Sequence, residues 1–426
     1  MGSEWRETTV GKFCHFTYGK SLPARKRNES GSIPVYGSGG LSGHHDESMV
    51  SDAGIVIGRK GTVGSITYSN CPFWPIDTVF YVTNDSHRDL KFTYYLLKTL
   101  GLEHMNADSA VPGLNRDAAH GVVFRAPPLP EQKAIAHILG TLDDKIELNR
   151  RMNATLEGMA QALFKSWFVD FDPAIDNALA AGNPIPDELA PRAEVRRQAL
   201  ANGTAQQGSV DHPTLSDPKS LFPAAFQLTE ELGWIPEGWE ISSFGDVSNC
   251  FDRKRIPLSK KQREEKKPGA IPYYGATSIM DFIDDWIFDD TYLLIGEDGS
   301  VMKEDGSPFV QYIWGKTWVN NHAHVLQGDD GVSTEHLMLF MQAQDITPYV
   351  TGAVQLKINQ KNMNSIPFLN AGSALSQRFS ECITPFYERI KKLTEENETL
   401  TKLRDTLLPK LISGDLRAAN QEQLTA

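Results

Sequence analysis

The sequence predicts an α+β fold of two similar globular domains of mixed α/β content, each followed by a long α-helix. Three features predict it: an internal repeat, two stretches of heptad-spaced apolar residues, and a proline-rich polar segment between the copies. A chain of 426 residues is too long for one ordinary domain. We expect the two helices to pair as an antiparallel coiled coil with pseudo-two-fold symmetry.

The repeat relates residues 4–168 to residues 238–412, which share an order of motifs rather than a close identity of letters. In order, the shared landmarks are Trp5 and Trp239, Gly11 and Gly245, the IPVYG and IPYYG segments from Ile33 and Ile271, and the Gly-rich apolar strands from Gly54 and Tyr292. Short β-type runs mix with a helix expected near 90–100 in the first copy. Two copies of one domain are therefore expected.

Each copy ends in a helix with heptad spacing, in which apolar residues and asparagines alternate four and three apart. Sustained spacing of this kind is typical of a coiled coil. The expected seam residues are Ile135, Leu139, Leu142, Ile146, Asn153, Leu156 and Leu163 in the first helix and Phe386, Ile390, Leu393, Asn397, Leu400 and Leu407 in the second. Antiparallel pairing is favoured because the second domain can then begin where the first helix ends.

Asparagine at a seam position lowers stability but penalises wrong registers. We expect Asn153 to face Asn397 near the middle of the helix pair. The alternative is that both are polar residues tolerated near solvent.

The expected boundaries follow from these patterns. The first domain covers residues 1–130 and the second covers 234–372, while the helices cover 131–170 and 373–416. Residues 171–233 form a linker, rich in Pro, Ala, Gly and Gln, with one helix expected around 188–200. Residues 417–426 form a polar tail.

Composition indicates a soluble, ordered, cytoplasmic protein. The net charge of −12 argues against a non-specific nucleic-acid binder, which is usually basic. The charge is uneven, however, with a basic run over residues 253–267 and acidic residues concentrated over 281–290. No apolar run approaches the roughly 20 residues of a membrane span, and the four cysteines lack the spacing of a disulfide framework or a zinc site.

No catalytic or metal-binding constellation stands out. Gly19-Lys20-Ser21 lacks the upstream glycine of a phosphate-binding loop, and the glycine-rich segment 58–64 opens no amphipathic helix. His44 and His45 are adjacent, so a solvated loop is a better interpretation than a metal site. For His322 and His324 we favour packing in the core or at a sheet edge. We therefore expect no catalytic residue, no metal and no bound cofactor in this chain.

DNA binding is the remaining interpretation of the basic clusters. Small neighbours let Arg59 and Lys60 approach a backbone or groove closely, the basic run would neutralise phosphates, and late loops carry groups able to contact base edges. The candidates are Arg25, Lys26, Arg27, Arg59, Lys60, Asn115 and Arg116 in the first copy and Arg253, Lys254, Arg255, Lys260, Lys261, Gln355, Lys357 and Asn359 in the second. For any single one, a solubilising surface charge is the plain alternative.

Four motifs in this order resemble one protein family. The sequence PPLPEQKAIAHILGTLDDKIELNRRMN from Pro127 is followed by SWFVDFDP, then LGWIPEGWE, and finally LLPKLISGDL from Leu407. Together they make the chain similar, over nearly its whole length, to the specificity subunit of type I restriction–modification enzymes. The second helix departs from the pattern, because it starts at Ala371-Gly-Ser instead of a Pro-Leu-Pro-Glu-Gln sequence.

The resemblance implies two target-recognition domains that read the halves of a split, asymmetric DNA site, with the helices setting the spacer length. It implies partners as well: two modification subunits, which bring S-adenosylmethionine and methylate adenine, and restriction subunits, which use ATP and Mg and cleave DNA. On the outer helix faces, Met152, Met159, Phe164 and Phe168 are candidates for docking the modification subunits, unless they pack under the linker. The rival interpretations are a coiled-coil scaffold that binds only proteins and an autonomous DNA-acting enzyme such as a nuclease.

Overall fold

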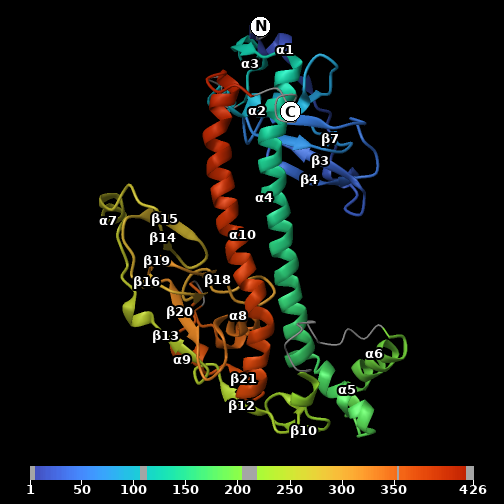
Figure 1. The fold of residues 1–426 in the computed structure, drawn as a ribbon, viewed down its shortest axis with the longest axis vertical. Coiled ribbons are helices and arrows are strands. Elements are labelled where there is room, and N and C mark those ends of the chain that lie inside the picture. Colours follow the sequence, from blue (N-terminus) through green and yellow to red (C-terminus); the bar gives the residue numbers. More distant parts are fainter. Residues whose placement is uncertain (1–4, 106–112, 204–217, 353–354, 419–426) are drawn as a thin grey trace, which may run out of the picture. The chain divides into compact units, whose positions relative to one another are not determined.

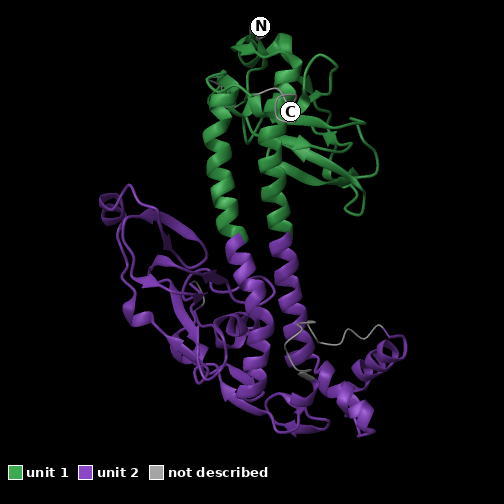
Figure 2. Ribbon diagram, viewed as in Figure 1, with its two compact units in different colours: residues 1–151, 393–426 green, residues 152–392 purple. Residues whose placement is uncertain are grey.

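The computed structural model describes residues 5–105, 113–203, 218–352 and 355–418. The chain divides into two compact units, shown in different colours in Figure 2. Unit 1 comprises residues 1–151 and 393–426, and unit 2 comprises residues 152–392. Each unit holds one globular domain and part of each of two long helices (Figures 1 and 2).

The globular part of unit 1 is a mixed α/β domain. Its main elements are β1 (Arg6–Thr9), α1 (Val10–Phe13), β2 (Thr17–Tyr18), β3 (Ile33–Gly37), β4 (Gly40–His45), β5 (Gly54–Gly58), β6 (Ile66–Ser69), β7 (Trp74–Pro75), β8 (Val79–Thr83), α2 (Leu90–Lys98), α3 (Arg116–Gly121) and β9 (Val123–Ala126). The strands form sheets in the orders β2-β8-β5-β6, β4-β3-β7 and β1-β9.

The globular part of unit 2 is larger. Its main elements are β10 (Phe226–Thr229), β11 (Gly233–Pro236), β12 (Glu240–Ser243), β13 (Ser248–Cys250), α7 (Lys260–Glu265), β14 (Ile271–Tyr274), β15 (Ile279–Ile283), β16 (Phe288–Asp289), β17 (Tyr292–Gly296), β18 (Val310–Ile313), β19 (Lys316–Val319), β20 (Ala323–Gly328), α8 (Thr334–Gln342), α9 (Gln360–Asn364) and β21 (Pro367–Asn370). The sheets have the orders β13-β20-β17-β18, β15-β14-β19-β16, β12-β21 and β10-β11.

The two domains repeat one topology, which confirms the predicted duplication. The order β2-β8-β5-β6 corresponds strand for strand to β13-β20-β17-β18, and β1-β9 corresponds to β12-β21. The central strands β5 and β17 are buried at every residue, as expected for short unbroken apolar runs. The helix expected near residues 90–100 is α2, and α8 takes the corresponding place in the order of unit 2.

The repeated glycines Gly11 and Gly245 occupy equivalent positions and are needed for the same steric reason. A Cβ added to Gly11 would lie 2.7 Å from the Cβ of His120, and one added to Gly245 would lie 2.8 Å from the Cβ of Asn364. Both partners lie on the short helix late in each domain, α3 or α9. The position therefore needs glycine in both copies because the chain passes directly under that helix.

The two long helices are α4 (Leu129–Phe164) and α10 (Ser373–Ser413). Within unit 1, Arg404 Nη1 lies 2.7 Å from Asp143 Oδ1, and Arg417 Nη1 lies 3.1 Å from Glu131 Oε1. As the residue number on α4 rises from 131 to 143, the number of its partner falls from 417 to 404. The helices pair antiparallel in this unit, as predicted.

Apolar seam residues pack in both units. In unit 1, Ile135 and Leu139 are fully buried in one cluster with Leu411, and Leu407 packs against it. In unit 2, Leu156 and Leu163 pack against a core that contains Ile390, joined there by Phe386. The Phe164 and Phe379 rings lie 6.1 Å apart in unit 2, which again sets the end of α4 against the start of α10.

The expected pairing of Asn153 with Asn397 is wrong. The Asn149 side chain, only 2% exposed, donates to Asn397 Oδ1 at 3.0 Å and to Glu396 Oε2 at 2.8 Å. Asn149 and Asn153 lie four residues apart on the same stripe of α4. Heptad spacing defines that stripe but does not fix the axial register between two helices.

The segment after α4 belongs to the core of unit 2. After Phe164 come a π-helical turn (Lys165–Val169) and Phe171, whose φ of 54° is left-handed and turns the chain into α5 (Asp172–Ala181). Trp167 and Phe168 are buried with Phe222 and Trp239. These contacts explain why the SWFVDFDP motif is rich in aromatic residues.

Two of the four suggested docking residues are therefore corrected. Phe164 and Phe168 are 5% and 7% exposed and lie in the core of unit 2, whereas Met152 and Met159 are 43% and 48% exposed. Heptad spacing predicts which residues face the partner helix, but it does not show that the unit 2 core also covers the end of α4.

Where the structure describes the expected linker, it contains two α-helices rather than one. The helix expected around 188–200 is α6 (Ala190–Ala201), and α5 precedes it. Two bidentate ion pairs join them: Arg192 binds Asp172, and Arg196 binds Asp176. The tail beyond residue 418 lies outside the described residues.

Candidate nucleic-acid interface

In unit 1, two segments meet where the central strand ends. Arg59 directly follows β5, its carbonyl accepts a hydrogen bond from Leu114 N at 2.9 Å, and Lys60 forms a β-bridge with Gly113. The segment that leads into α3 is thus held beside the strand exit. Arg59, Lys60, Asn115 and Arg116, predicted from separate parts of the sequence, lie together.

Tyr18 lies at the centre of this cluster, and no sequence pattern singled it out. The guanidinium carbons of Arg59 and Arg116 lie 5.0 and 5.1 Å from the centroid of the Tyr18 ring, which is 46% exposed. Cation–π contacts hold the two guanidinium groups over the ring. An exposed aromatic ring between two cations suits contact with phosphates and base edges.

The other candidates of unit 1 have mixed roles. Arg25 and Lys26 are exposed on a single 3₁₀ turn (Ala24–Lys26). Arg27 instead donates to the carbonyls of Leu22 and Ser42, at 3.3 and 2.6 Å, which braces its own loop. Asn115 caps α3, its side-chain oxygen accepting from Asp117 N and Ala118 N.

The corresponding place in unit 2 has the same backbone and different side chains. Glu297 directly follows β17, its carbonyl accepts from Ile358 N at 3.0 Å, and Asp298 forms a β-bridge with Lys357. Asn359 caps α9 as Asn115 caps α3. Gln355 and Lys357 are exposed on the segment before the helix.

Arg255 is part of the interior of unit 2. Its guanidinium donates to Glu297 Oε2 at 2.7 Å and to the Ala323 carbonyl at 2.6 Å, and it lies 3.2 Å from Asp252 Oδ2. The side chain is 12% exposed. This arginine fixes the strand ends, and contact with DNA stays a prediction for it.

The basic run is partly neutralised within the domain. Arg263 lies 3.2 Å from Asp281, Lys267 lies 3.1 Å from Asp281, and Lys266 lies 2.9 Å from Asp285. Asp281 and Asp285, from the acidic stretch 281–290, are thus partners of the basic run. In contrast, Arg253, Lys254, Lys260 and Lys261 are exposed.

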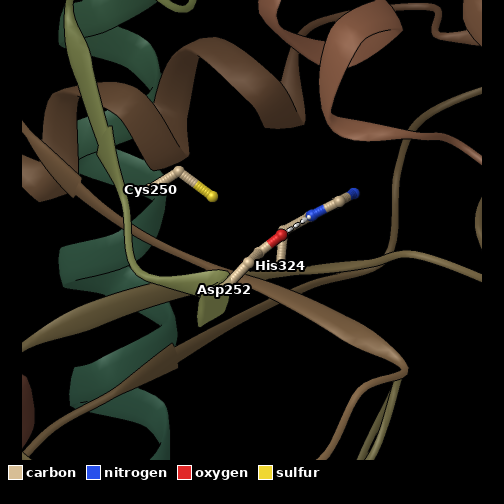
Figure 3. Close-up of side chains that lie close together, drawn as sticks. All are labelled: Cys250, Asp252 and His324. Carbon is tan, nitrogen blue, oxygen red and sulfur yellow. Dashed lines mark hydrogen bonds and ion pairs between the residues drawn. The ribbon is translucent and has the colours of Figure 1, made fainter. Parts of the chain in front are cut away.

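Cys250, Asp252 and His324 lie close together in unit 2 (Figure 3). Their hydrogen bonds are made inside the protein: His324 Nδ1 lies 2.5 Å from Asp252 Oδ2, and its Nε2 lies 2.9 Å from the Ile358 carbonyl. Burial raises the pKa of the Cys250 thiol to about 12.

This trio has the residue types of a metal site or a nucleophilic triad, but its geometry favours a structural role. Both ring nitrogens of His324 already have hydrogen-bond partners, Asp252 and the Ile358 carbonyl, and a thiol with a raised pKa is a poor nucleophile. The Asp252 carboxylate also accepts from Val325 N at 2.9 Å and contacts Arg255, so a cation would have to displace a guanidinium. Packing in the core, which the sequence favoured for His324, agrees with its exposed fraction of 1%.

Besides Tyr18, Glu297 and Asp298 were not among the residues expected from the sequence. A signal for these two carboxylates was present, because aligning the copies at Gly58 and Gly296 places Glu297 and Asp298 opposite Arg59 and Lys60. The change from two cations to two carboxylates hides the equivalence. His322 was noticed, but not the partner that fixes its ring, since 24 residues separate it from Asp298.

None of the helices in the described ranges combines the length and apolarity required to span a bilayer. The described residues thus form two copies of an α+β domain, each with polar loops at the end of its central strand, and two long helices that pair antiparallel within each unit. A family model described as the type I restriction modification DNA specificity domain matches residues 2–158 and 236–398, more than half of the chain. The chain therefore belongs to the family of type I restriction–modification specificity subunits.

Relatives agree with this assignment. The chain is 25% identical over 332 residues to the type I restriction enzyme HindI specificity subunit of Haemophilus influenzae, covering 72% of this chain and 71% of the relative. It is 22% identical over 472 residues to the MjaIX specificity subunit of Methanocaldococcus jannaschii, covering 97% of both. The crystal structure of the S subunit from M. genitalium shares the fold, with a TM-score of 0.56 at 16% identity and 96% coverage of each chain.

Proposed function

We propose that this chain recognises a bipartite, asymmetric site in double-stranded DNA, each domain reading one half. One observation carries the proposal: the same loops meet at the end of the central strand in both domains, but with different side chains. In unit 1 they present Arg59, Lys60 and Arg116, and in unit 2 the corresponding strand exit begins with Glu297 and Asp298. One scaffold with two sets of polar groups suits two different half-sites.

We further propose that α4 and α10 set the length of the spacer between the half-sites. A helix of 36 residues is about 54 Å long. Ion pairs and buried seam residues join the two helices within unit 1, and an apolar core joins them within unit 2. A continuous helix pair is stiff enough to keep a fixed distance along the DNA.

The chemistry is proposed to belong to partners. Two modification subunits would bring S-adenosylmethionine and methylate an adenine in each half-site after flipping it out of the duplex, and restriction subunits would bring ATP and Mg for cleavage, all in the cytoplasm. In support, the one Cys–Asp–His trio of the described residues is engaged in internal hydrogen bonds. Met152 and Met159 are exposed apolar residues on α4 that suit docking of a modification subunit.

Selection from a random duplex library tests the proposal. The full chain, assembled with its modification subunits, is used to enrich bound duplexes at two salt concentrations. We expect two unlike conserved blocks separated by a fixed number of unconserved base pairs. A single contiguous motif, or enrichment without any sequence preference, would contradict the proposal.

A further inference from the structure

Each domain has an equivalent β-bridge at the end of its central strand, but the cation in the bridge lies on the opposite side in the two domains. In unit 1 the bridge joins Lys60, on the strand-exit side, to Gly113. In unit 2 it joins Asp298, on the strand-exit side, to Lys357. At the bridge itself, the cation is the strand-exit residue in unit 1 and the residue of the opposing segment in unit 2, where the strand-exit residue is a carboxylate.

The carboxylates of unit 2 lie beneath more exposed partners. Glu297 is 14% exposed and contacts Lys357 Nζ at 3.3 Å, while the Lys357 side chain is 49% exposed. Asp298 is 20% exposed and contacts His322 Nδ1 at 2.5 Å, while the His322 side chain is 46% exposed. In each pair the carboxylate is the shielded member and the basic group reaches solvent.

The Asp298 contact fixes the orientation of the His322 ring. A carboxylate accepts the Nδ1 proton, so the opposite ring nitrogen, Nε2, points away from Asp298. The His322 backbone is fixed as well, since its carbonyl accepts from Glu297 N at 2.8 Å and its N donates to Asn320 Oδ1 at 2.8 Å. An exposed ring held at both backbone and side chain loses little freedom on binding.

We propose that His322, positioned by Asp298, and Lys357, positioned by Glu297, determine the base specificity of the second domain. The inference rests on the proposed function, because it assumes that this strand-end edge faces DNA. The Lys357 ammonium is a donor only, so its ligand is an acceptor edge such as O6 and N7 of guanine. His322 contacts the neighbouring base through Nε2.

The test compares base preferences of the wild-type complex with those of His322→Ala, Asp298→Asn and Lys357→Ala complexes, again by selection from random duplexes. His322→Ala should reduce discrimination at one position of one half-site by about 5-fold to 50-fold. Asp298→Asn should weaken the base preference at that same position. Lys357→Ala should weaken the preference for guanine at a neighbouring position. A residue with a purely structural role would weaken binding overall and would not change the base preference at one position.

Each complex contains its own control, because the half-site read by the first domain should keep its sequence and spacer. Lys303→Ala, an exposed substitution in unit 2, should leave both half-sites unchanged. Should the His322→Ala domain fail to fold, the other two variants decide. Unchanged preference in folded variants overturns this inference alone, whereas a wild-type complex that selects no bipartite site overturns the proposed function.

Discussion

His336 is enclosed by aromatic rings in unit 2, with the Phe168 and Phe379 rings 4.7 and 4.8 Å from its own. It is 1% exposed, and desolvation lowers its pKa from 6.5 to about 3. The folded state therefore holds a neutral ring, while the unfolded chain takes up a proton below pH 6.5. The stabilising contribution is complete above that pH and is lost as pH falls toward 3.

We predict that His336→Phe removes this acid sensitivity. Wild-type stability should fall by on the order of 1.4 kcal/mol per pH unit below 6.5 from this group, and the phenylalanine variant should lack that component. Urea unfolding at pH 7.5 and pH 5, followed by tryptophan fluorescence, measures it. The exposed substitution His87→Ala serves as control. Equal pH dependence in wild type and His336→Phe would refute the assignment.

At the scale of residues, the sequence predicted clusters better than individual roles. Arg59 and Arg116 were expected on separate loops, and the structure brings both to the Tyr18 ring. Arg27 and Arg255 look alike in sequence as parts of basic clusters, yet their guanidinium groups bind backbone carbonyls. Composition shows that a charge is present but not which group it binds.

Among the elements, helix α7 carries cations of two kinds, exposed lysines and an arginine that is paired within the domain. Lys260 and Lys261 are exposed, whereas Arg263 pairs with Asp281 and lies over the Tyr273 ring at 5.2 Å. If α7 contacts phosphates, the exposed lysines should carry the salt dependence of binding. The paired arginine should instead stabilise the β14–β15 hairpin.

We predict that Lys260→Ala/Lys261→Ala lowers the slope of log K against log salt by about 2, since each phosphate contact contributes about 0.9. Arg263→Ala should lower the melting temperature and leave the slope unchanged. Binding of the assembled complex to one duplex at several salt concentrations measures the slope. A larger slope change for Arg263→Ala than for the lysine pair would contradict this division.

The asparagine pair gives a second prediction at this scale. Replacing Asn149 and Asn397 together by leucine removes two partly desolvated polar groups from the seam. We expect the free energy of unfolding to rise by about 1–2 kcal/mol. Asn149→Leu alone should destabilise by about 1–3 kcal/mol, because the hydrogen bonds from Asn149 to Asn397 and Glu396 are lost. Chemical denaturation measures both, and a double variant less stable than wild type would exclude a specificity role.

Element types were predictable because the signals are local, while the register was not. The heptad stripe on α4 and the apolar runs of β5 and β17 follow from neighbouring residues. The Asn149–Asn397 contact depends on how far one helix slides along another, which apolar spacing leaves open. Helix α5 was hidden in a segment whose alanines and prolines are also typical of linkers.

For the architecture of the full chain, duplication was the strongest signal in the sequence. A shared order of landmarks predicted two copies of one domain, and the matching sheet orders confirm it. Sequence similarity between the copies is weak at the strand-end loops. We attribute that weakness to the different half-sites that each copy is proposed to read.

The central claim is that the paired helices fix the distance between two half-sites. It is tested by inserting one heptad after Ile146 in α4 and one after Leu400 in α10, which lie at the same level of the pair between the Asp143–Arg404 and Asn149–Asn397 contacts. Seven residues add about 10.5 Å, equivalent to about 3 base pairs. The lengthened complex should bind more weakly, because the added base pairs also rotate the DNA.

The decisive measurement is the spacer length selected from a random duplex library by the lengthened complex and by the wild type. We predict the same two half-site sequences in both, with a spacer longer by about 3 base pairs in the variant. An unchanged spacer in a folded, DNA-binding variant would contradict the account.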